Sequence, residues 1–320
     1  MYRPEITVVD CTIRDAGLMN NSRFPDETVA AVYRAICEAG IQIVELGYKN
    51  SKRMLSTDDY GPWRFCDEDA LRRVTEGVES QTKISVMMDS HKAEAEDLLP
   101  KDQSVIDMVR VATYVKDVDK AILLVNHAND KGYETTINIM AISHALDREL
   151  DEAIDQIGRE TNVAACYIVD SFGALYSEDI DYYVAKYRQH LGKGKEIGIH
   201  CHNQQQLAFA NTIEGIIKGA NYLDGTLLGT GRAAGNCPLE LLLGFLKNPK
   251  FYIRPVLDVI GKYILPLQSE MDWGYHVPYM ISGMLNVHPQ ESMDFMEKDS
   301  SDPTRHDFVK FYDEVLESIR

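Results

Sequence analysis

The sequence predicts an α/β fold, a closed (β/α)8 TIM barrel with a helical C-terminal extension. Three observations carry this prediction. Short apolar runs alternate with amphipathic segments in eight successive units. The apolar runs show little period-two alternation, as expected of parallel strands that are covered on both faces. No GxGxxG follows the first run, which favours the closed barrel over a doubly wound open sheet.

The predicted strands are rich in Val, Ile and other residues that favour β-structure, and they are expected at 5–10, 41–47, 83–89, 104–112, 134–141, 164–170, 195–201 and 221–229. Segments with apolar residues at helical spacing follow them at 26–40, 116–131, 147–161, 178–190, 204–219 and 238–246. In the first of these helices, Asp26 stands near the start and Gly40 just past the end.

The alternation stops near residue 250, where stretches such as DFVKFYDEVLESI indicate helices without further strands. We therefore expect two parts, a catalytic barrel over 1–250 and a helical extension over 251–320. The segment 48–65, after the second strand, is too long for a minimal βα loop. Because such loops lie on the catalytic face of a barrel, we expect it to act as a lid or to contact substrate.

The bulk composition excludes several classes of function. A net charge of −17 argues against nucleic-acid binding, although a few buried arginines could still bind a small anionic substrate. The six cysteines are scattered without a CxxC pair, which indicates reduced thiols and a cytoplasmic location. The N-terminus lacks the apolar core of a signal peptide, and no apolar run approaches the roughly 20 residues of a membrane span.

The sharpest chemical signal is His200-Cys201-His202 at the end of the seventh predicted strand. Residues two apart on a strand point to the same side, so the two imidazoles converge inside the barrel mouth. An aspartate from another strand would add an oxygen ligand, and Asp10 and Asp15 both lie at the end of the first strand. This mixed set suits Mn²⁺, Mg²⁺, Co²⁺, Fe²⁺ or Zn²⁺, and ligand type alone does not choose between them. An isolated HxH can be incidental, but its place at a strand end favours a metal site.

Other polar residues also fall where strands end, which is where barrel enzymes build their sites. Arg14 follows the first strand and Glu45 ends the second. We expect Asn138, Ser171 and Arg232 to bind substrate. Arg232 belongs to the glycine-rich loop GTGRAAGN (229–236), which could bind an oxyanion or could be a tight turn without a ligand. Asn236 in the same loop is a further candidate metal or substrate ligand.

The segments DCTIRDAG, VELG, IHCHN and GTGRAAGNCPLE together resemble the DRE-TIM metallolyase superfamily, also called HMGL-like. The Asp, Arg and Glu of its name fall on Asp15, Arg14 and Glu45. The resemblance covers about residues 5–285. Within the superfamily, YIVDSFGALYSEDI and WGYHVPYMISG look most like the 4-hydroxy-2-oxovalerate aldolase branch.

The resemblance implies a divalent-metal-dependent aldolase that cleaves a 4-hydroxy-2-oxo acid through a pyruvate enolate. It implies Asp15, His200 and His202 as metal ligands, with Asn236 added as in the lyase branch. Arg14 would steady the enolate oxygen. The metal is expected to be Mn²⁺ or Mg²⁺, with Co²⁺ or Zn²⁺ as alternatives.

Two other functions stay open at this point. One is a Claisen-type acyltransferase that joins acetyl-CoA to a 2-oxo acid, as in the isopropylmalate and homocitrate synthases. The other is a barrel repurposed without catalysis. Besides its small-molecule substrate, the chain is expected to form a homo-oligomer, and an aldehyde dehydrogenase is a candidate partner.

The sequence departs from the aldolase branch at the catalytic base. That branch has a histidine four residues after the arginine, where this chain has Leu18, and no histidine occurs between positions 1 and 90. Aldol cleavage still needs a group that accepts the proton of the 4-hydroxyl. We therefore expect the acceptor to come from the C-terminal extension, where Tyr275 most nearly matches a family tyrosine and His276 stands beside it.

Overall fold

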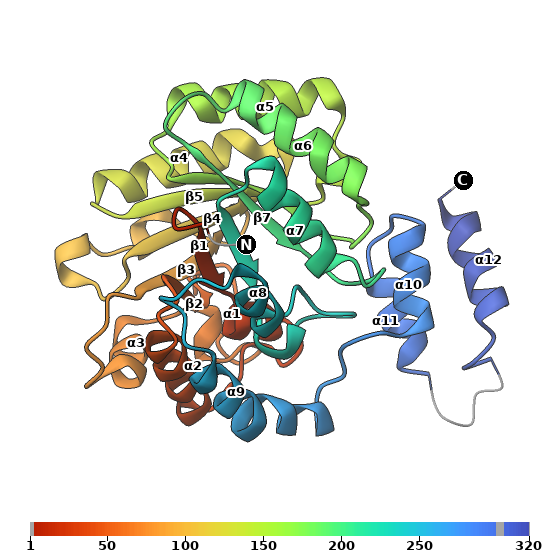
Figure 1. The fold of residues 1–320 in the computed structure, drawn as a ribbon, viewed down its shortest axis with the longest axis horizontal. Helices are drawn as coiled ribbons and strands as arrows, with labels where there is room; N and C mark the ends of the chain where they lie inside the picture. The colour runs from red at the N-terminus through yellow and green to blue at the C-terminus, as the bar shows by residue number, and fades with distance from the viewer. Residues whose placement is uncertain (1–2, 299–303, 320) are drawn as a thin grey trace.

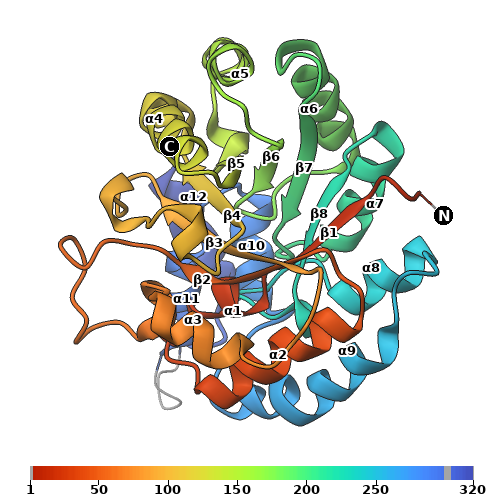
Figure 2. The same ribbon diagram turned by 90° about the vertical axis from the view of Figure 1, so that its left-hand side faces the viewer.

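The computed structural model describes residues 3–298 and 304–319, and it confirms the predicted barrel. Eight parallel strands pair in chain order, and β1 closes the ring by pairing with β8. Figure 2 shows the helices arranged around this ring. The strands are β1 (Thr7–Asp10), β2 (Ile43–Tyr48), β3 (Lys83–Asp89), β4 (Met108–Thr113), β5 (Glu134–Ile139), β6 (Ala165–Asp170), β7 (Glu196–Cys201) and β8 (Tyr222–Gly225).

Helices follow almost every strand. The barrel helices are α1 (Thr12–Ala16), α2 (Asp26–Glu38), α3 (Glu68–Thr75), α4 (Val118–Asp130), α5 (Asp147–Glu160), α6 (Ser177–His190), α7 (Ala208–Lys218) and α8 (Leu239–Leu246).

Two local features differ from the expected pattern. After β3 the chain makes two 3₁₀ turns, at Ala95–Asp97 and Lys101–Gln103, in place of the helix that a regular strand–helix unit would have. The strand β8 is shorter than the expected 221–229, because the chain turns into a 3₁₀ segment at Leu227–Gly229.

Inside the barrel, inward-facing residues form levels. A small apolar cluster contains Val9, Cys11, Ile43 and Met108. Farther along, the guanidinium of Arg110 lies 4.5 Å from the ring centroid of Tyr167. A Cβ on Gly198 would stand 2.5 Å from that ring, so glycine is needed there for Tyr167 to fill the interior. Polar groups occupy the level above, at the carboxyl ends of the strands.

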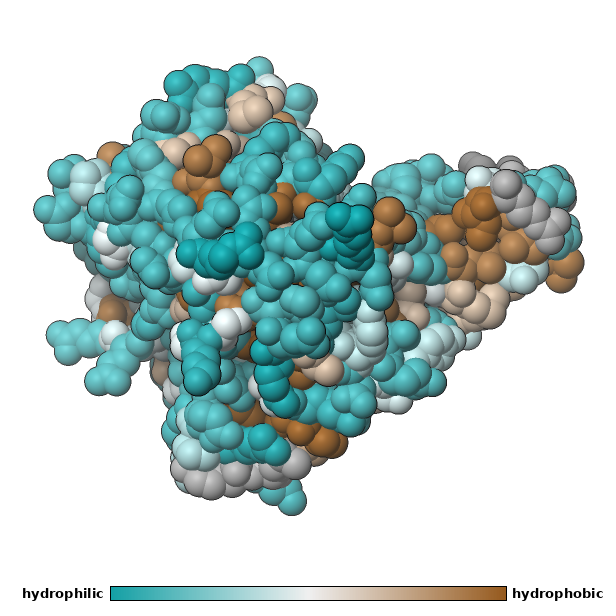
Figure 3. Space-filling view, turned by 90° about the horizontal axis from the view of Figure 1, so that it is seen from above, coloured by the Kyte–Doolittle hydropathy of each residue, from teal (hydrophilic) through white to brown (hydrophobic). Residues whose placement is uncertain are grey.

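The C-terminal residues form two different arrangements. Helix α9 (Ile253–Val259) packs against α2 on the outside of the barrel. Helices α10 (Val277–Met284), α11 (Gln290–Met296) and α12 (Phe308–Ser318) form a lobe that projects from the barrel on the right of Figure 1. The lobe has its own small core and shows apolar patches on an otherwise hydrophilic surface in Figure 3. A domain boundary at residue 250 stays a prediction.

The residues just before α10 join the lobe to the mouth of the barrel. The Trp273 side chain is buried and packs with the main core of the barrel. Its Nε1 donates to the Leu228 carbonyl at 3.2 Å, and the Gly274 N–H donates to the Ala233 carbonyl at 3.2 Å. Both acceptors lie in the chain that follows β8, so the lobe is anchored beside the glycine-rich loop.

Within residues 3–298 and 304–319, no helix is both long enough and apolar enough to cross a membrane.

A β-bulge near the end of β2 re-aims one side chain. Glu45 pairs with Ser85, but it is Tyr48 that pairs with Met87, so β2 carries one extra residue between these points. Gly47 lies in this stretch with φ +152°, and a Cβ on it would stand 2.2 Å from the Trp63 carbonyl oxygen. The bulge therefore gives Tyr48, rather than Gly47, the inward place beside Met87.

Replacing Gly47 with alanine should destabilise the barrel by roughly 1–3 kcal/mol, because the backbone conformation and the nearby carbonyl both oppose a Cβ. Gly244→Ala is the matched control, since nothing lies within 4 Å of a Cβ there and the residue is inside α8. The free energy of unfolding of that control should stay the same or rise by about 0.5–1 kcal/mol. Thermal unfolding of both variants checks this, and equal melting temperatures would contradict the role of Gly47.

Candidate metal and substrate site

A small cavity of about 100 Å³ opens at the carboxyl ends of the strands. Its lining combines most of the residues predicted from sequence with an apolar wall. The lining residues are Arg14, Asp15, Leu18, Tyr48, Met87, Asp89, Ala112, Asn138, Met140, Val169, Ser171, His200, His202 and Arg232.

Asp15, His200 and His202 come together at one side of this cavity. All three are buried, and one ligand atom from each lies within 4.8 Å of the others. His200 Nε2 is 3.5 Å from Asp15 Oδ2. The group has the geometry expected of converging ligands for a divalent cation.

Two buried oxygens beside this group have no hydrogen-bond donor among the described residues, Asp15 Oδ1 and Asn236 Oδ1. The Asn236 amide nitrogen donates to the Thr230 carbonyl at 3.1 Å, which fixes the side chain. A Cβ on Gly231 would stand 2.1 Å from Asn236 Nδ2 and 2.8 Å from Asp15 Oδ1, so glycine allows their close approach. Buried acceptors are rarely left without a partner, and a cation would satisfy both.

The protonation states also suit a metal. Burial would raise the pKa of Asp15, but Arg14 and His200 outweigh burial and hold it well below its usual range. Burial lowers the pKa of His202 to about 3, so its imidazole is neutral. Burial would also lower the pKa of His200, but hydrogen bonds with Asp15 and Asp224 outweigh it and raise the pKa. A metal ion therefore competes with a proton only at His200, since metals bind carboxylates and neutral imidazoles.

Arg14 is held on two sides by carboxylates. Its Nε donates to Glu45 Oε2 at 2.7 Å and its Nη1 donates to Asp15 Oδ2 at 2.5 Å, which leaves Nη2 for a ligand in the cavity. Glu45 is fully buried and does not line the cavity. It lies behind Arg14 and also pairs with Arg110 at 3.0 Å, so its place is that of a positioning residue.

Asp224 orients the imidazole of His200 through a hydrogen bond with Nδ1. Arg110 Nη2 donates to Asp224 Oδ2 at 2.6 Å, and His200 Nδ1 lies 3.0 Å from the same oxygen. Burial would raise the pKa of Asp224, but Arg110 and His200 outweigh it and lower the pKa to about 2. The carboxylate thus fixes the ring so that Nε2 faces Asp15.

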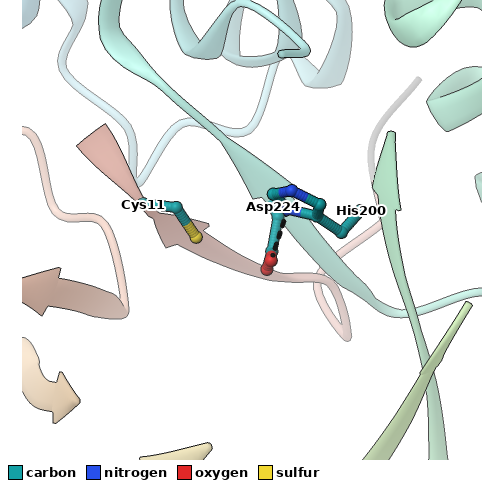
Figure 4. A group of neighbouring side chains, drawn as sticks. All are labelled: Cys11, His200 and Asp224. Carbon is teal, nitrogen blue, oxygen red and sulfur yellow. Dashed lines mark hydrogen bonds and ion pairs between the residues drawn. The ribbon is translucent and has the colours of Figure 1, made fainter. Parts of the chain in front are cut away.

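Cys11, His200 and Asp224 form a second group with ligand-type atoms close together (Figure 4). This group is a poor metal site. Burial raises the pKa of the Cys11 thiol well above its usual value, and Arg110 already donates to both Cys11 Sγ and Asp224. A cation there would meet a guanidinium instead of free ligands.

The predicted substrate-binding residues all reach the cavity. Asn138 Oδ1 accepts from Thr136 at 3.1 Å, and Ser171 Oγ accepts from the Ala141 N–H at 2.8 Å. The Nε of Arg232 is buried without a hydrogen-bond partner among the described residues. An unpaired guanidinium group beside a metal site fits a carboxylate ligand.

Tyr275 and His276 do not line the cavity. They lie in a separate surface cleft with residues of α10, α11 and α12. Tyr275 is 56% exposed, and His276 pairs with Asp272 at 3.0 Å. In this conformation neither side chain is placed to accept a proton from a ligand in the cavity, because both line the separate cleft.

Four residues of the site were missed from the sequence. Arg110 and Asp224 lie within apolar strands, where an inward-facing charge is itself a signal of a buried network. Asp89 ends β3 as Asp170 ends β6, so its place at a strand end was visible. Tyr48 could not be assigned, since its inward direction depends on the β-bulge.

The chain is similar to a known family over most of its length. The HMGL-like family model matches residues 5–259. Oxaloacetate decarboxylase of Mycobacterium tuberculosis is 30% identical over 245 residues, covering 76% of this chain and 70% of that protein. 4-Hydroxy-2-oxovalerate aldolase of Thermus thermophilus is 30% identical over 252 residues, covering 79% of this chain and 71% of that protein.

Solved structures give the same picture. The N-terminal domain of a candidate aldolase from Bacteroides vulgatus superposes with a TM-score of 0.80 at 29% identity, covering 92% of this chain and 97% of that one. The HMG-CoA lyase of Brucella melitensis superposes with a TM-score of 0.66 at 14% identity, covering 82% of this chain and 99% of that one, which shows a shared fold.

Replacing His202 with alanine should abolish the binding of about one divalent metal ion per chain, because one of the converging ligands is lost. Cys11→Ala is the control that separates the two groups, and it should keep its metal. Metal content after dialysis, measured by mass spectrometry, checks both variants. Loss of metal from the Cys11 variant alone would move the site to the second group.

Proposed function

The chain belongs to the HMGL-like family and is a carbon–carbon lyase, and we propose that it cleaves a 4-hydroxy-2-oxo acid to pyruvate and an aldehyde. The observation that supports this most is the joining of Asp15, His200 and His202 with Arg14 in one small cavity. The proposed metal is Mn²⁺ or Mg²⁺, with Co²⁺ or Zn²⁺ as alternatives, held by these three ligands and Asn236.

A divalent cation bound there would supply Lewis acidity toward the keto oxygen of a 2-oxo acid. Arg14 acts on the same oxygen from the protein side. Because Glu45 and Asp15 hold its Nε and Nη1, its free Nη2 is fixed in direction before substrate binds. A donor arranged in advance stabilises the negative charge that develops as the bond between C3 and C4 breaks.

The remaining polar residues bind and orient the substrate. Arg232 is placed to pair with the carboxylate, and Asn138 and Ser171 offer hydrogen-bonding groups on the neighbouring wall. Leu18, Met87 and Met140 give another wall an apolar character that suits the carbon chain of the aldehyde half.

Decarboxylation of oxaloacetate is a second candidate function. The observation that favours it is Leu18, which faces the cavity where a base would be expected. Release of CO₂ from a 3-carboxylate forms the same enolate but requires no proton to be removed in the bond-breaking step. A relative of similar identity is named as an oxaloacetate decarboxylase. The Claisen-type condensation has no such observation in its favour.

One panel of assays separates these functions. Purified, metal-supplemented protein should release pyruvate from 4-hydroxy-2-oxo acids. A coupled lactate dehydrogenase assay measures the pyruvate. Oxaloacetate is tested in parallel for CO₂ release. Acetyl-CoA with a set of 2-oxo acids is tested for thiol release. Thiol release without pyruvate formation from any hydroxy-oxo acid would overturn the proposal.

Replacing Arg14 with lysine should lower the turnover number by roughly 10²–10³ while metal content is retained, because lysine cannot bridge Glu45 and Asp15 and still present a donor to the substrate. Steady-state kinetics and metal analysis check this. Arg23→Lys, a surface arginine outside the cavity, is the matched control. Full activity of the Arg14 variant would show that the guanidinium does not stabilise the transition state.

A further inference from the structure

The cavity contains a phenol that the metal and substrate assignments leave unused. Tyr48 lines the same cavity as Arg14 and Asp15 and is 8% exposed. Among the described residues, its hydroxyl has no hydrogen-bond partner, so the group is free to meet a ligand. Burial raises its pKa, and the phenol therefore keeps its proton near neutral pH.

The ring of Tyr48 stacks against the guanidinium of Arg64. The guanidinium of Arg64 lies 4.8 Å from the Tyr48 ring centroid and 4.7 Å from the ring centroid of Tyr60. Arg64 is itself buried. This stack, together with the bulge at Gly47, fixes the direction of the phenol into the cavity.

The other proton-exchanging groups of the cavity are occupied. Asp89 Oδ1 accepts from the His91 N–H at 2.9 Å, and its Oδ2 lies 3.1 Å from the Lys92 ammonium. Ser171 Oγ accepts from the Ala141 N–H. His200 and His202 themselves belong to the candidate metal group. Among the described lining residues, Tyr48 has a hydroxyl that makes no hydrogen bond and can both accept and donate a proton.

We propose that Tyr48 carries the proton in aldol cleavage, an inference that rests on the proposed function. As the bond between C3 and C4 breaks, the 4-hydroxyl proton passes to the Tyr48 oxygen and the Tyr48 proton passes to C3. The hydroxyl carbon becomes the aldehyde, C3 becomes the methyl group of pyruvate, and the tyrosine ends as it began. No external oxidant, reductant or further base takes part.

The packing around Tyr48 agrees with this role. Leu18 packs against the same small cluster, which also contains Met87, Ala112 and Met140. The phenol on β2 therefore lies beside the residue that follows β1 at the position where a histidine was expected. The proton-transfer group has moved to the neighbouring strand while the metal group stays in place.

The test compares two reactions of metal-loaded Tyr48→Phe protein. Cleavage of 4-hydroxy-2-oxovalerate should fall by roughly 10²–10³, whereas CO₂ release from oxaloacetate should change by less than about threefold, because no proton moves as CO₂ leaves and water can protonate the enolate afterwards. Tyr60→Phe keeps its ring on Arg64 and is the matched control for both reactions. Metal content and the affinity for pyruvate, measured by calorimetry, should match wild type.

A second variant gives the inference a positive readout. Leu18→His in the Tyr48→Phe background should restore cleavage by at least about tenfold, since an imidazole at that position can accept the proton. Cleavage by Tyr48→Phe at the wild-type rate would overturn the inference, and so would an equal loss of both reactions. Wild-type protein that releases CO₂ but cleaves no hydroxy-oxo acid would instead overturn the proposed aldol function.

Discussion

The site depends on one buried set of ion pairs that crosses the interior of the barrel. Arg14 joins Asp15 to Glu45, and Arg110 joins Glu45 to Asp224. His200 then lies between Asp224 and Asp15 and closes the set into a ring. Its three carboxylates and two guanidiniums leave one negative charge, and buried charge is costly unless it is paired, here by a proton on His200 or by a bound cation. A cation at Asp15 is the natural partner for that charge.

Only a closed barrel can assemble this ring. Asp15 follows β1, whereas His200 lies on β7 and Asp224 on β8. In an open sheet of the same strand order, β1 and β8 would stand at opposite edges. The pairing of β1 with β8 brings them together, and the pairing of Val9 with Asp224 sets their level. Closure of the barrel is thus a requirement of the chemistry as well as of the fold.

The fold and the convergence of His200 and His202 could be predicted from sequence because both depend on local patterns. Apolar runs give the strands, and a strand's period of two makes His200 and His202 converge. The supporting residues could not be predicted in the same way. Arg110 and Asp224 meet only through the register of distant strands, and the direction of Tyr48 depends on an extra residue in β2. For Tyr275 and His276 the local pattern misled, because their segment resembles a family motif but lines a separate cleft outside the cavity.

Two walls of the cavity are held in place by different interactions, one by ion pairs and the other by apolar packing. The wall with Arg14 and Asp15 is built from ion pairs in which each group fixes the next, so a single exchange there would leave a buried charge without a partner. The apolar wall, with Leu18, Met87 and Met140, is held by packing, which tolerates changes of side chain more readily. Under the proposed function, the choice of substrate and of proton carrier can therefore change on that wall while the groups proposed to stabilise the enolate stay the same. This separation explains how relatives named as an aldolase and as a decarboxylase can resemble this chain to the same degree.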